Sequence, residues 1–320
     1  MEKLAQDMKI IRRTDIDISD RDASIDFARI IGCIIVIGVH TLLPVTEAND
    51  LSRTFIAALF ADGVSVFWLI TGAFLFSDTN NYPKVVRRTI HRIVLPLILV
   101  SAFLFFFRDW VIYGETIIKS IQHTRSDYTK VVWCIVRFRN PIEGNGALWY
   151  LYVYIILMIC FPIMASFVKY LDEDINRERL FLFISLVMLT LNDISNNELF
   201  GVSNVTISEA VPGGIIIIMG HIIYKHKECI ASNKKQVLIS ALVLFFALNL
   251  LRTYIQIQRQ QKDLGNQILF WYSSIGIICA ACILMICIVV FSGKSGGGSK
   301  LDRQLYFSHI SNTHASKGFP

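Results

Sequence analysis

Two residues that are costly to place in a membrane lie on the first apolar stretch of the chain, Arg29 and His40. Their eleven-residue spacing is close to three turns of an α-helix, so they share one helix face, about 16 Å apart along its axis. Asp26, three residues before Arg29, falls near the same face. Arg29 alone also suits an interfacial residue that orients the helix, and His40 alone suits a structural contact with a neighbouring helix. Together they predict a functional face with a cation at one membrane surface and an imidazole at depth.

The composition indicates that the elements positioning these residues are membrane-spanning helices. Of the 320 residues, 54% are hydrophobic and 18% are charged, whereas charged residues make up roughly 25% of an average soluble domain. The apolar residues gather in blocks, several of them close to the ~20 residues that cross a hydrocarbon core. The net charge of +6 fits basic cytoplasmic loops, and no nucleic-acid-binding motif accompanies it. We therefore expect an integral membrane protein that has no nucleic-acid partner.

Eight apolar blocks predict an all-α fold, a polytopic bundle of about eight transmembrane helices. The expected spans are 29–46, 54–76, 93–113, 147–168, 180–192, 210–224, 236–251 and 268–292. Residues 1–28 form a polar cytoplasmic segment without a signal-peptide pattern, and residues 29–292 form the transmembrane domain. Residues 293–320 start with the glycine- and serine-rich composition of a linker and continue as a polar tail.

Basic residues in alternate loops predict the orientation of the bundle. Four lysines and arginines lie in 84–92 and four lysines lie in 225–235, whereas the segment 193–209 has neither residue type. Because basic residues concentrate in cytoplasmic loops, the N-terminus is expected to be cytoplasmic. The segment 114–146 is predicted to be external and yet is basic, which long translocated loops tolerate.

Four motifs in this order resemble the membrane acyltransferase-3 family, which includes bacterial O-acetyltransferases of surface polysaccharides. The first is the Arg29–His40 spacing preceded by Ile25-Asp26; the others lie at 66–76, 84–96 and 147–152. They resemble, respectively, the family's second-span signature, its basic entry to the third span and its Leu-Trp-Tyr-Leu span. The resemblance covers about 20–292. The family usually has about ten spans, so the C-terminal end of this chain is expected to be atypical or truncated.

The resemblance implies an enzyme that takes an acyl group, commonly acetyl from acetyl-CoA, and passes it to a sugar hydroxyl across a bacterial inner membrane. The acceptor is then a lipid-linked or surface glycan such as O-antigen. Separately, no spacing among the histidines resembles a metal site, so no metal is expected. Coenzyme A is polyanionic, and arginine binds phosphate through a bidentate fork. We therefore expect four arginines to bind acetyl-CoA on the cytoplasmic side: Arg29, Arg87, Arg88 and Arg92.

The expected chemistry centres on the first span. His40 is predicted to be the base that deprotonates the acceptor hydroxyl, or else the transient acyl carrier, since neutral imidazole suits either role. Asp26 is expected to orient Arg29 or another basic group. At the external mouth, Trp149 and Tyr150 are candidates to stack on a sugar, and Glu143 is a candidate to face the acceptor.

Two other kinds of function remain open from the sequence. Many spans, a histidine at depth and basic gates also suit a transporter of a polysaccharide precursor or small solute, although no repeated halves are visible. An inactive family member would bind ligand without turnover. Consumption of a thioester that depends on an acceptor sugar distinguishes the enzyme from both.

Overall fold

The computed structural model describes 23–42, 51–76, 82–100, 114–119, 149–196, 210–260 and 274–292, with 103, 107 and 110. Every element in these ranges is helical, which confirms the all-α prediction for the described part of the chain. The elements are α2 (Ala23–Leu42), α3 (Leu51–Leu59), α4 (Gly63–Leu75), α5 (Tyr82–Thr89), the π-helical turn η4 (Ile90–Val94), α9 (Trp149–Ile159), α10 (Phe161–Asp172), α11 (Ile175–Asn196), α12 (Ala210–Lys225), α13 (Lys227–Ala231), α14 (Lys234–Gln260) and α15 (Ile275–Ser292).

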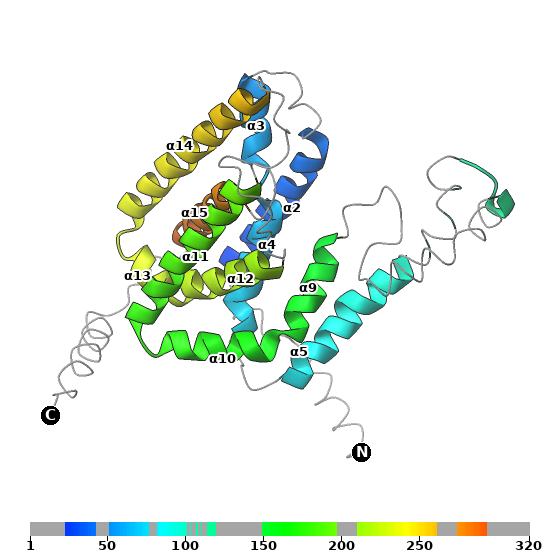
Figure 1. The fold of residues 1–320 in the computed structure, drawn as a ribbon, viewed down its shortest axis with the longest axis horizontal. Helices are drawn as coiled ribbons and strands as arrows, with labels where there is room; N and C mark the ends of the chain where they lie inside the picture. The colour runs from blue at the N-terminus through cyan, green and yellow to red at the C-terminus, as the bar shows by residue number, and fades with distance from the viewer. Residues whose placement is uncertain are drawn as a thin grey trace, which may run out of the picture.

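Helix α4 lies at the centre of the bundle and crosses α12 at very short range (Figure 1). Glycines allow this approach: a Cβ atom on Gly72 would overlap the carbonyl oxygen of Ile217, and one on Gly220 would overlap the carbonyl oxygen of Leu69. Small residues at a crossing let two backbones touch, which is how helices associate where lipid removes the hydrophobic driving force. The α4–α12 crossing is therefore specified by glycine rather than by apolar bulk.

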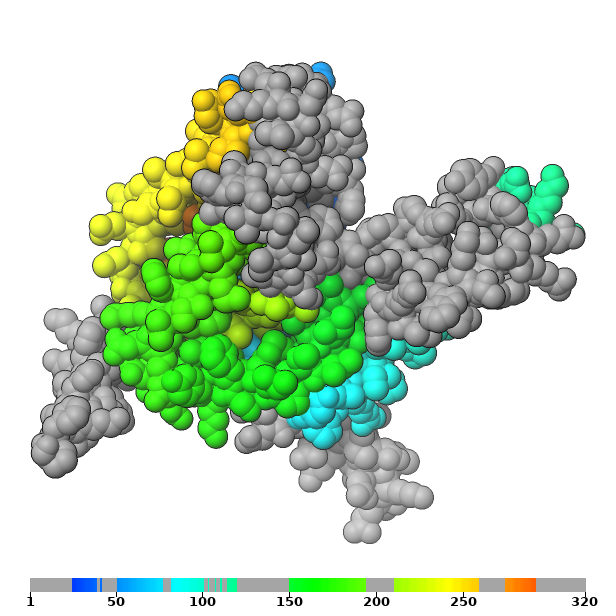
Figure 2. Space-filling view, in the orientation of Figure 1, coloured from blue at the N-terminus to red at the C-terminus, as the bar shows by residue number. Residues whose placement is uncertain are grey.

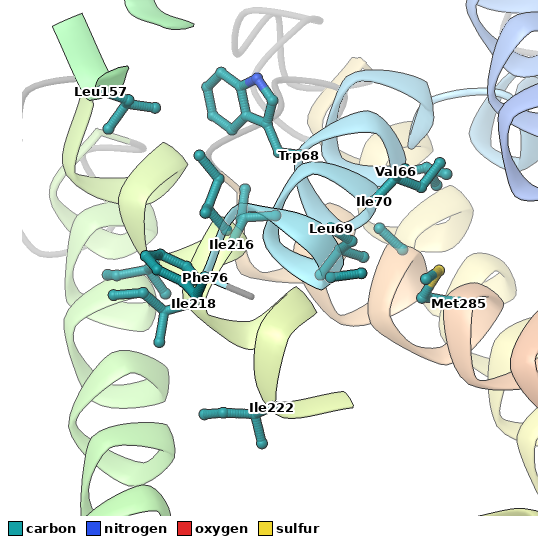
Figure 3. Packing of buried hydrophobic residues seen from close by; sticks show 14 of the residues in the cluster. Val66, Trp68, Leu69, Ile70, Phe76, Leu157, Ile216, Ile218, Ile222 and Met285 are labelled. Atoms are coloured by element: carbon teal, nitrogen blue, oxygen red, sulfur yellow. The ribbon is translucent and has the colours of Figure 1, made fainter. Parts of the chain in front are cut away.

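The apolar core surrounds this crossing and is completed by α9, α10 and α15 (Figure 3). Trp68 and Leu69 of α4 and Ile216 of α12 are almost fully buried, as are Phe161 of α10 and Met285 of α15. These residues come from segments as far apart as 68 and 285, so the core joins the two halves of the chain into one bundle.

Helix α2 packs along α4 and α15, and its contact with the start of α4 is again close. A Cβ atom on Gly63 would lie 2.7 Å from a methyl carbon of Val36, and one on Gly38 would overlap the ring of Phe60. The chain between α3 and α4, residues 60–62, therefore lies against the second half of α2. This contact fixes α2 beside the central helix.

Large apolar side chains cover the outer surface of α11 and α14. Phe183, Leu186 and Leu191 of α11 and Val243 and Leu251 of α14 are all more than a third exposed. In Figure 2, α11 (green) lies on the face toward the viewer and α14 (yellow) is visible along the left edge. A water-soluble protein seldom exposes so much contiguous apolar surface, whereas lipid tails cover it without cost. The fold is therefore that of a membrane protein.

Among the residues that the structure describes, two helical stretches are long and apolar enough to cross a membrane, Leu51–Leu75 and Lys234–Gln258, and a third crossing results if α9 and α10 are counted together. Helices α12 and α15 are apolar but shorter. The prediction of about eight spans is thus not confirmed, and it stays a prediction. Within the described ranges, the predicted span 147–168 is divided: α9 and α10 meet at 69° on either side of Cys160. Pro162 favours a new helix there, because proline suits the first helical turn.

Several helices begin or end at the same end of the bundle, which we call the basic end. Phe27, near the start of α2, stacks on Phe291 at the end of α15, with ring centroids 6.2 Å apart. Lys234, which begins α14, donates a hydrogen bond to the carbonyl oxygen of Phe291. Phe76, just after α4, lies edge-on to the ring of His221 in the last turns of α12. The opposite end therefore holds the start of α3 and α15 and the end of α14.

Candidate functional site

Arg29 and His40 both belong to α2, so one helix carries the two residues that the sequence analysis paired. Arg29 lies near the basic end, where its Nη1 contacts Asp26 Oδ1 at 2.7 Å. The Arg29 side chain is half exposed, so its remaining N–H groups are accessible to a ligand. The side chain of His40 lies outside the described part of the structure, and its predicted role in catalysis stays a prediction.

The predicted phosphate-binding arginines occupy the segment that follows α4. Arg87 and Arg88 lie in the last turn of α5, and Arg92 lies in the π-helical turn η4; all three side chains are exposed. A π-helical turn is rare and occurs often at functional sites. Tyr82, at the start of α5, stacks on Phe161 at 6.3 Å, and Phe161 also stacks on Phe76. Aromatic packing therefore attaches this arginine-rich segment to the basic end.

The predicted acceptor residues are only partly described. Trp149 begins α9, but its side chain lies outside the description, as does the whole of Glu143. Tyr150 is partly buried in the first turn of α9. The roles assigned to these three residues stay predictions.

A network of charged side chains at the basic end was missed by the sequence analysis as a unit. Lys225 Nζ donates to Asp172 Oδ1 at 2.8 Å and to Glu178 Oε1 at 2.5 Å. His226 Nε2 lies 2.7 Å from Glu178 Oε2, and His221 Nε2 lies 3.2 Å from the Asp172 carboxylate. The network joins the end of α12 to the turn between α10 and α11.

Burial and hydrogen bonding in this network act in opposite directions on the pKa of its central lysine, Lys225. Burial alone lowers the pKa of Lys225, but the hydrogen bonds to Asp172 and Glu178 outweigh it, so its pKa is raised above that of a free lysine. Glu178 is 2% exposed and would be costly to bury without these partners. The carboxylate partners of His221 and His226 lie more than 45 positions away along the chain, so no local sequence pattern connects them.

A second group missed from the sequence lies toward the opposite end, inside the bundle. Arg252 of α14 is 4% exposed and Asp62, just before α4, is fully buried. Arg252 Nη1 donates to Asp62 Oδ1 at 3.1 Å and to Asn249 Oδ1 at 2.8 Å. The predicted seventh span ends at residue 251, which leaves Arg252 outside the membrane. Helix α14 continues to Gln260, which places this arginine within the bundle.

The described side chains include no group of three His, Cys, Asp or Glu residues arranged to hold a metal ion. The side chains that suit a large anionic cofactor are instead the exposed arginines near the basic end, Arg29, Arg87, Arg88 and Arg92. Guanidinium groups bind phosphate oxygens bidentately and remain charged at any physiological pH.

Comparison with known protein families gives one match. A family model with the description acyltransferase domain, of the acyltransferase-3 type, matches residues 22–312. The match thus includes α2, every other described helix and part of the predicted tail. Neither the curated proteins nor the solved structures gave a match.

Proposed function

The chain belongs to the acyltransferase-3 family and is a membrane acyltransferase; from this premise we propose that it moves an acetyl group from acetyl-CoA to a hydroxyl of a cell-surface polysaccharide such as O-antigen. The observation that carries the proposal is the family match over residues 22–312, within which the Arg29–His40 helix and the arginine-rich segment both fall. The location proposed is a bacterial inner membrane with the N-terminus in the cytoplasm.

The arginines support the donor half of this proposal. Coenzyme A carries several phosphate charges at one end of a long arm and the thioester at the other. Arg87, Arg88 and Arg92 are exposed on one short segment, and Arg29 is half exposed at the start of α2. Phosphates held there leave the arm free to run along α2. The eleven residues from Arg29 to His40 span about 16 Å of helix, which a flexible arm can follow.

Transfer of the acetyl group needs a base for the acceptor hydroxyl. In the direct route, His40 takes the hydroxyl proton as the sugar oxygen attacks the thioester carbonyl. The C–S bond then breaks, and the coenzyme A thiolate takes up a proton. In the two-step route, an imidazole nitrogen attacks the thioester carbonyl and expels the coenzyme A thiolate. The sugar oxygen then attacks the acetyl carbonyl, the C–N bond breaks, and the freed imidazole takes the hydroxyl proton. Asp26 holds Arg29 through the 2.7 Å ion pair and so supports the donor site rather than the proton transfer.

The test is consumption of acetyl-CoA by the full chain in proteoliposomes, together with acetylation of surface glycans in cells that express it. His40→Ala is expected to abolish transfer, and Arg29→Ala is expected to weaken the binding of acetyl-CoA. Glu173→Gln, which removes an exposed partner of Arg177, serves as a control at matched protein level. Unchanged acetylation in both test variants would remove the two residues from the mechanism. Glycan movement without acetyl-CoA consumption would favour a transporter.

A further inference from the structure

The buried pair Asp62–Arg252 has more hydrogen-bonding capacity than its partners use. Both contacts of Arg252 use Nη1, and its Nε and Nη2 have no hydrogen-bond partner within the described part of the chain. The same holds for Asp62 Oδ2. Leaving a buried polar group unpaired costs about 1–3 kcal/mol, and more for a charged group. A pair retained only to hold helices together would be expected to satisfy these atoms, so the pair has the capacity to bind a further polar group.

The position of Asp62 points to the same conclusion. Asp62 is the residue that precedes α4, where an aspartate normally accepts a hydrogen bond from the first turn of the helix. It makes no such capping bond and pairs with Arg252 instead. By contrast, Asp193 of α11 accepts hydrogen bonds from the Ser274 hydroxyl and the Ile275 amide at the start of α15. The two acids at this end of the bundle thus differ: Asp193 caps a helix, whereas Asp62 keeps one oxygen available.

Charge and polarity define which ligand fits this pair. The site is neutral overall, because one carboxylate balances one guanidinium, so neither an anion nor a cation gains net attraction. It presents donors on Arg252 and an acceptor on Asp62, and a hydroxyl group can both accept and donate a hydrogen bond. Thr54 adds a further buried hydroxyl without a described partner, eight residues before Asp62 on the α3 face that also buries Ala57 and Ala58. A neutral ligand with hydroxyl groups matches the unpaired atoms of Arg252 and Asp62.

The pair also lies where an acceptor would be needed. Arg252 is eighteen residues into α14, about 27 Å along the helix from the basic end. Gly63, next to Asp62, contacts Val36 of α2, and His40 lies four residues after Val36 and so belongs to the same helix face by register. The pair therefore adjoins the part of α2 that carries the proposed catalytic base.

We propose that Asp62 and Arg252 bind hydroxyl groups of the sugar acceptor inside the bundle, beside the middle of α2. This inference rests on the proposed function for the identity of the ligand, and on the unpaired buried atoms for the site itself. Arg252 Nε and Nη2 donate to one sugar oxygen or to two neighbouring ones, and Asp62 Oδ2 accepts from a sugar hydroxyl. Asn249 holds Arg252 in place through the 2.8 Å contact.

The experiment measures sugar binding apart from turnover. The full chain in lipid nanodiscs is heated with rising concentrations of methyl glycosides of common hexoses, and the midpoint of unfolding is recorded. The variants are Arg252→Lys, Thr54→Val and the double variant Asp62→Leu with Arg252→Met, since replacing a buried ion pair by apolar residues is often tolerated. Sugars stabilise proteins weakly by exclusion from their surface; the double variant and a fully O-methylated glucoside give that baseline. Ser274→Ala is the matched control.

The expected result is a saturable rise in the unfolding midpoint of the wild type with at least one glycoside. Arg252→Lys should weaken the apparent affinity about tenfold or more, Thr54→Val should weaken it less, and Ser274→Ala should leave it unchanged. A wild type that shows only the linear baseline, or a double variant that keeps the saturable response, overturns the inference and leaves a pair that holds only water. Saturable binding without sugar-dependent acetyl-CoA consumption would instead refute the proposed function and leave the sugar site standing.

Discussion

The α4–α12 crossing leaves no room for a side chain at Gly72, and this predicts that a single methyl group destabilises the bundle. In Gly72→Ala, the new Cβ overlaps the carbonyl oxygen of Ile217 and lies 2.7 Å from the carbonyl carbon. Neither atom moves by rotating a side chain, so the helices must separate. Overpacking of this kind costs about 1–3 kcal/mol. Alanine is about 1 kcal/mol more favourable than glycine inside a helix, so the net destabilisation is up to about 2 kcal/mol.

The same substitution elsewhere on α12 supplies the control. A Cβ atom on Gly214 would lie 3.6 Å from a methyl carbon of Leu157 and 3.8 Å from the sulfur of Met164, which are ordinary contacts. Gly214→Ala should therefore stabilise the protein by up to about 1 kcal/mol. Reversible unfolding in mixed micelles, followed by tryptophan fluorescence, measures both variants. If Gly72→Ala proved as stable as Gly214→Ala, the close crossing of α4 and α12 would be refuted.

The remaining predictions concern charge. Glu178→Gln removes a buried carboxylate from Lys225 and should lower the free energy of unfolding by about 1–3 kcal/mol, whereas the exposed change Glu173→Gln should alter it by less than about 0.5 kcal/mol. Equal effects in thermal unfolding would contradict the buried network. The double change of Arg88→Gln and Arg92→Gln should weaken coenzyme A binding about tenfold or more, with a smaller salt dependence than the wild type. An unchanged dissociation constant in nanodiscs would exclude this segment as the phosphate site.

The positions of α11 and α12 were predictable because hydropathy is a local property. The apolar block 210–224 corresponds almost residue for residue to α12, and 180–192 lies within α11. The bend at Cys160 carried a local signal too, since Pro162 follows it directly and proline starts helices more readily than it continues them. The sequence nevertheless gave no reason to divide the block 147–168, because it is long enough to cross the membrane as one helix.

The polar contacts were not predictable from the sequence for a physical reason. Hydropathy gives the depth of a span and not its rotation about its axis, and rotation decides which side chains face one another. Asp62 and Arg252 are 190 residues apart, and their side chains meet only because α3 packs against α14. The Asp26–Arg29 pair was accessible, by contrast, because three residues along one helix always bring two side chains to one face. Local pairs could be predicted, and pairs between helices could not.

Helix α12 is short for its central place, and its length bears on the path that an acyl group must follow. Its sixteen residues extend about 24 Å, less than the ~30 Å hydrocarbon thickness of a typical bilayer. Buried between other helices, α12 is shielded from the mismatch that would tilt or thin the surrounding lipid. Helix α11, which packs against α12 and carries Glu178 of the charged network, has 22 residues and exceeds that thickness. A path along α12 is therefore shorter than one along its neighbour α11.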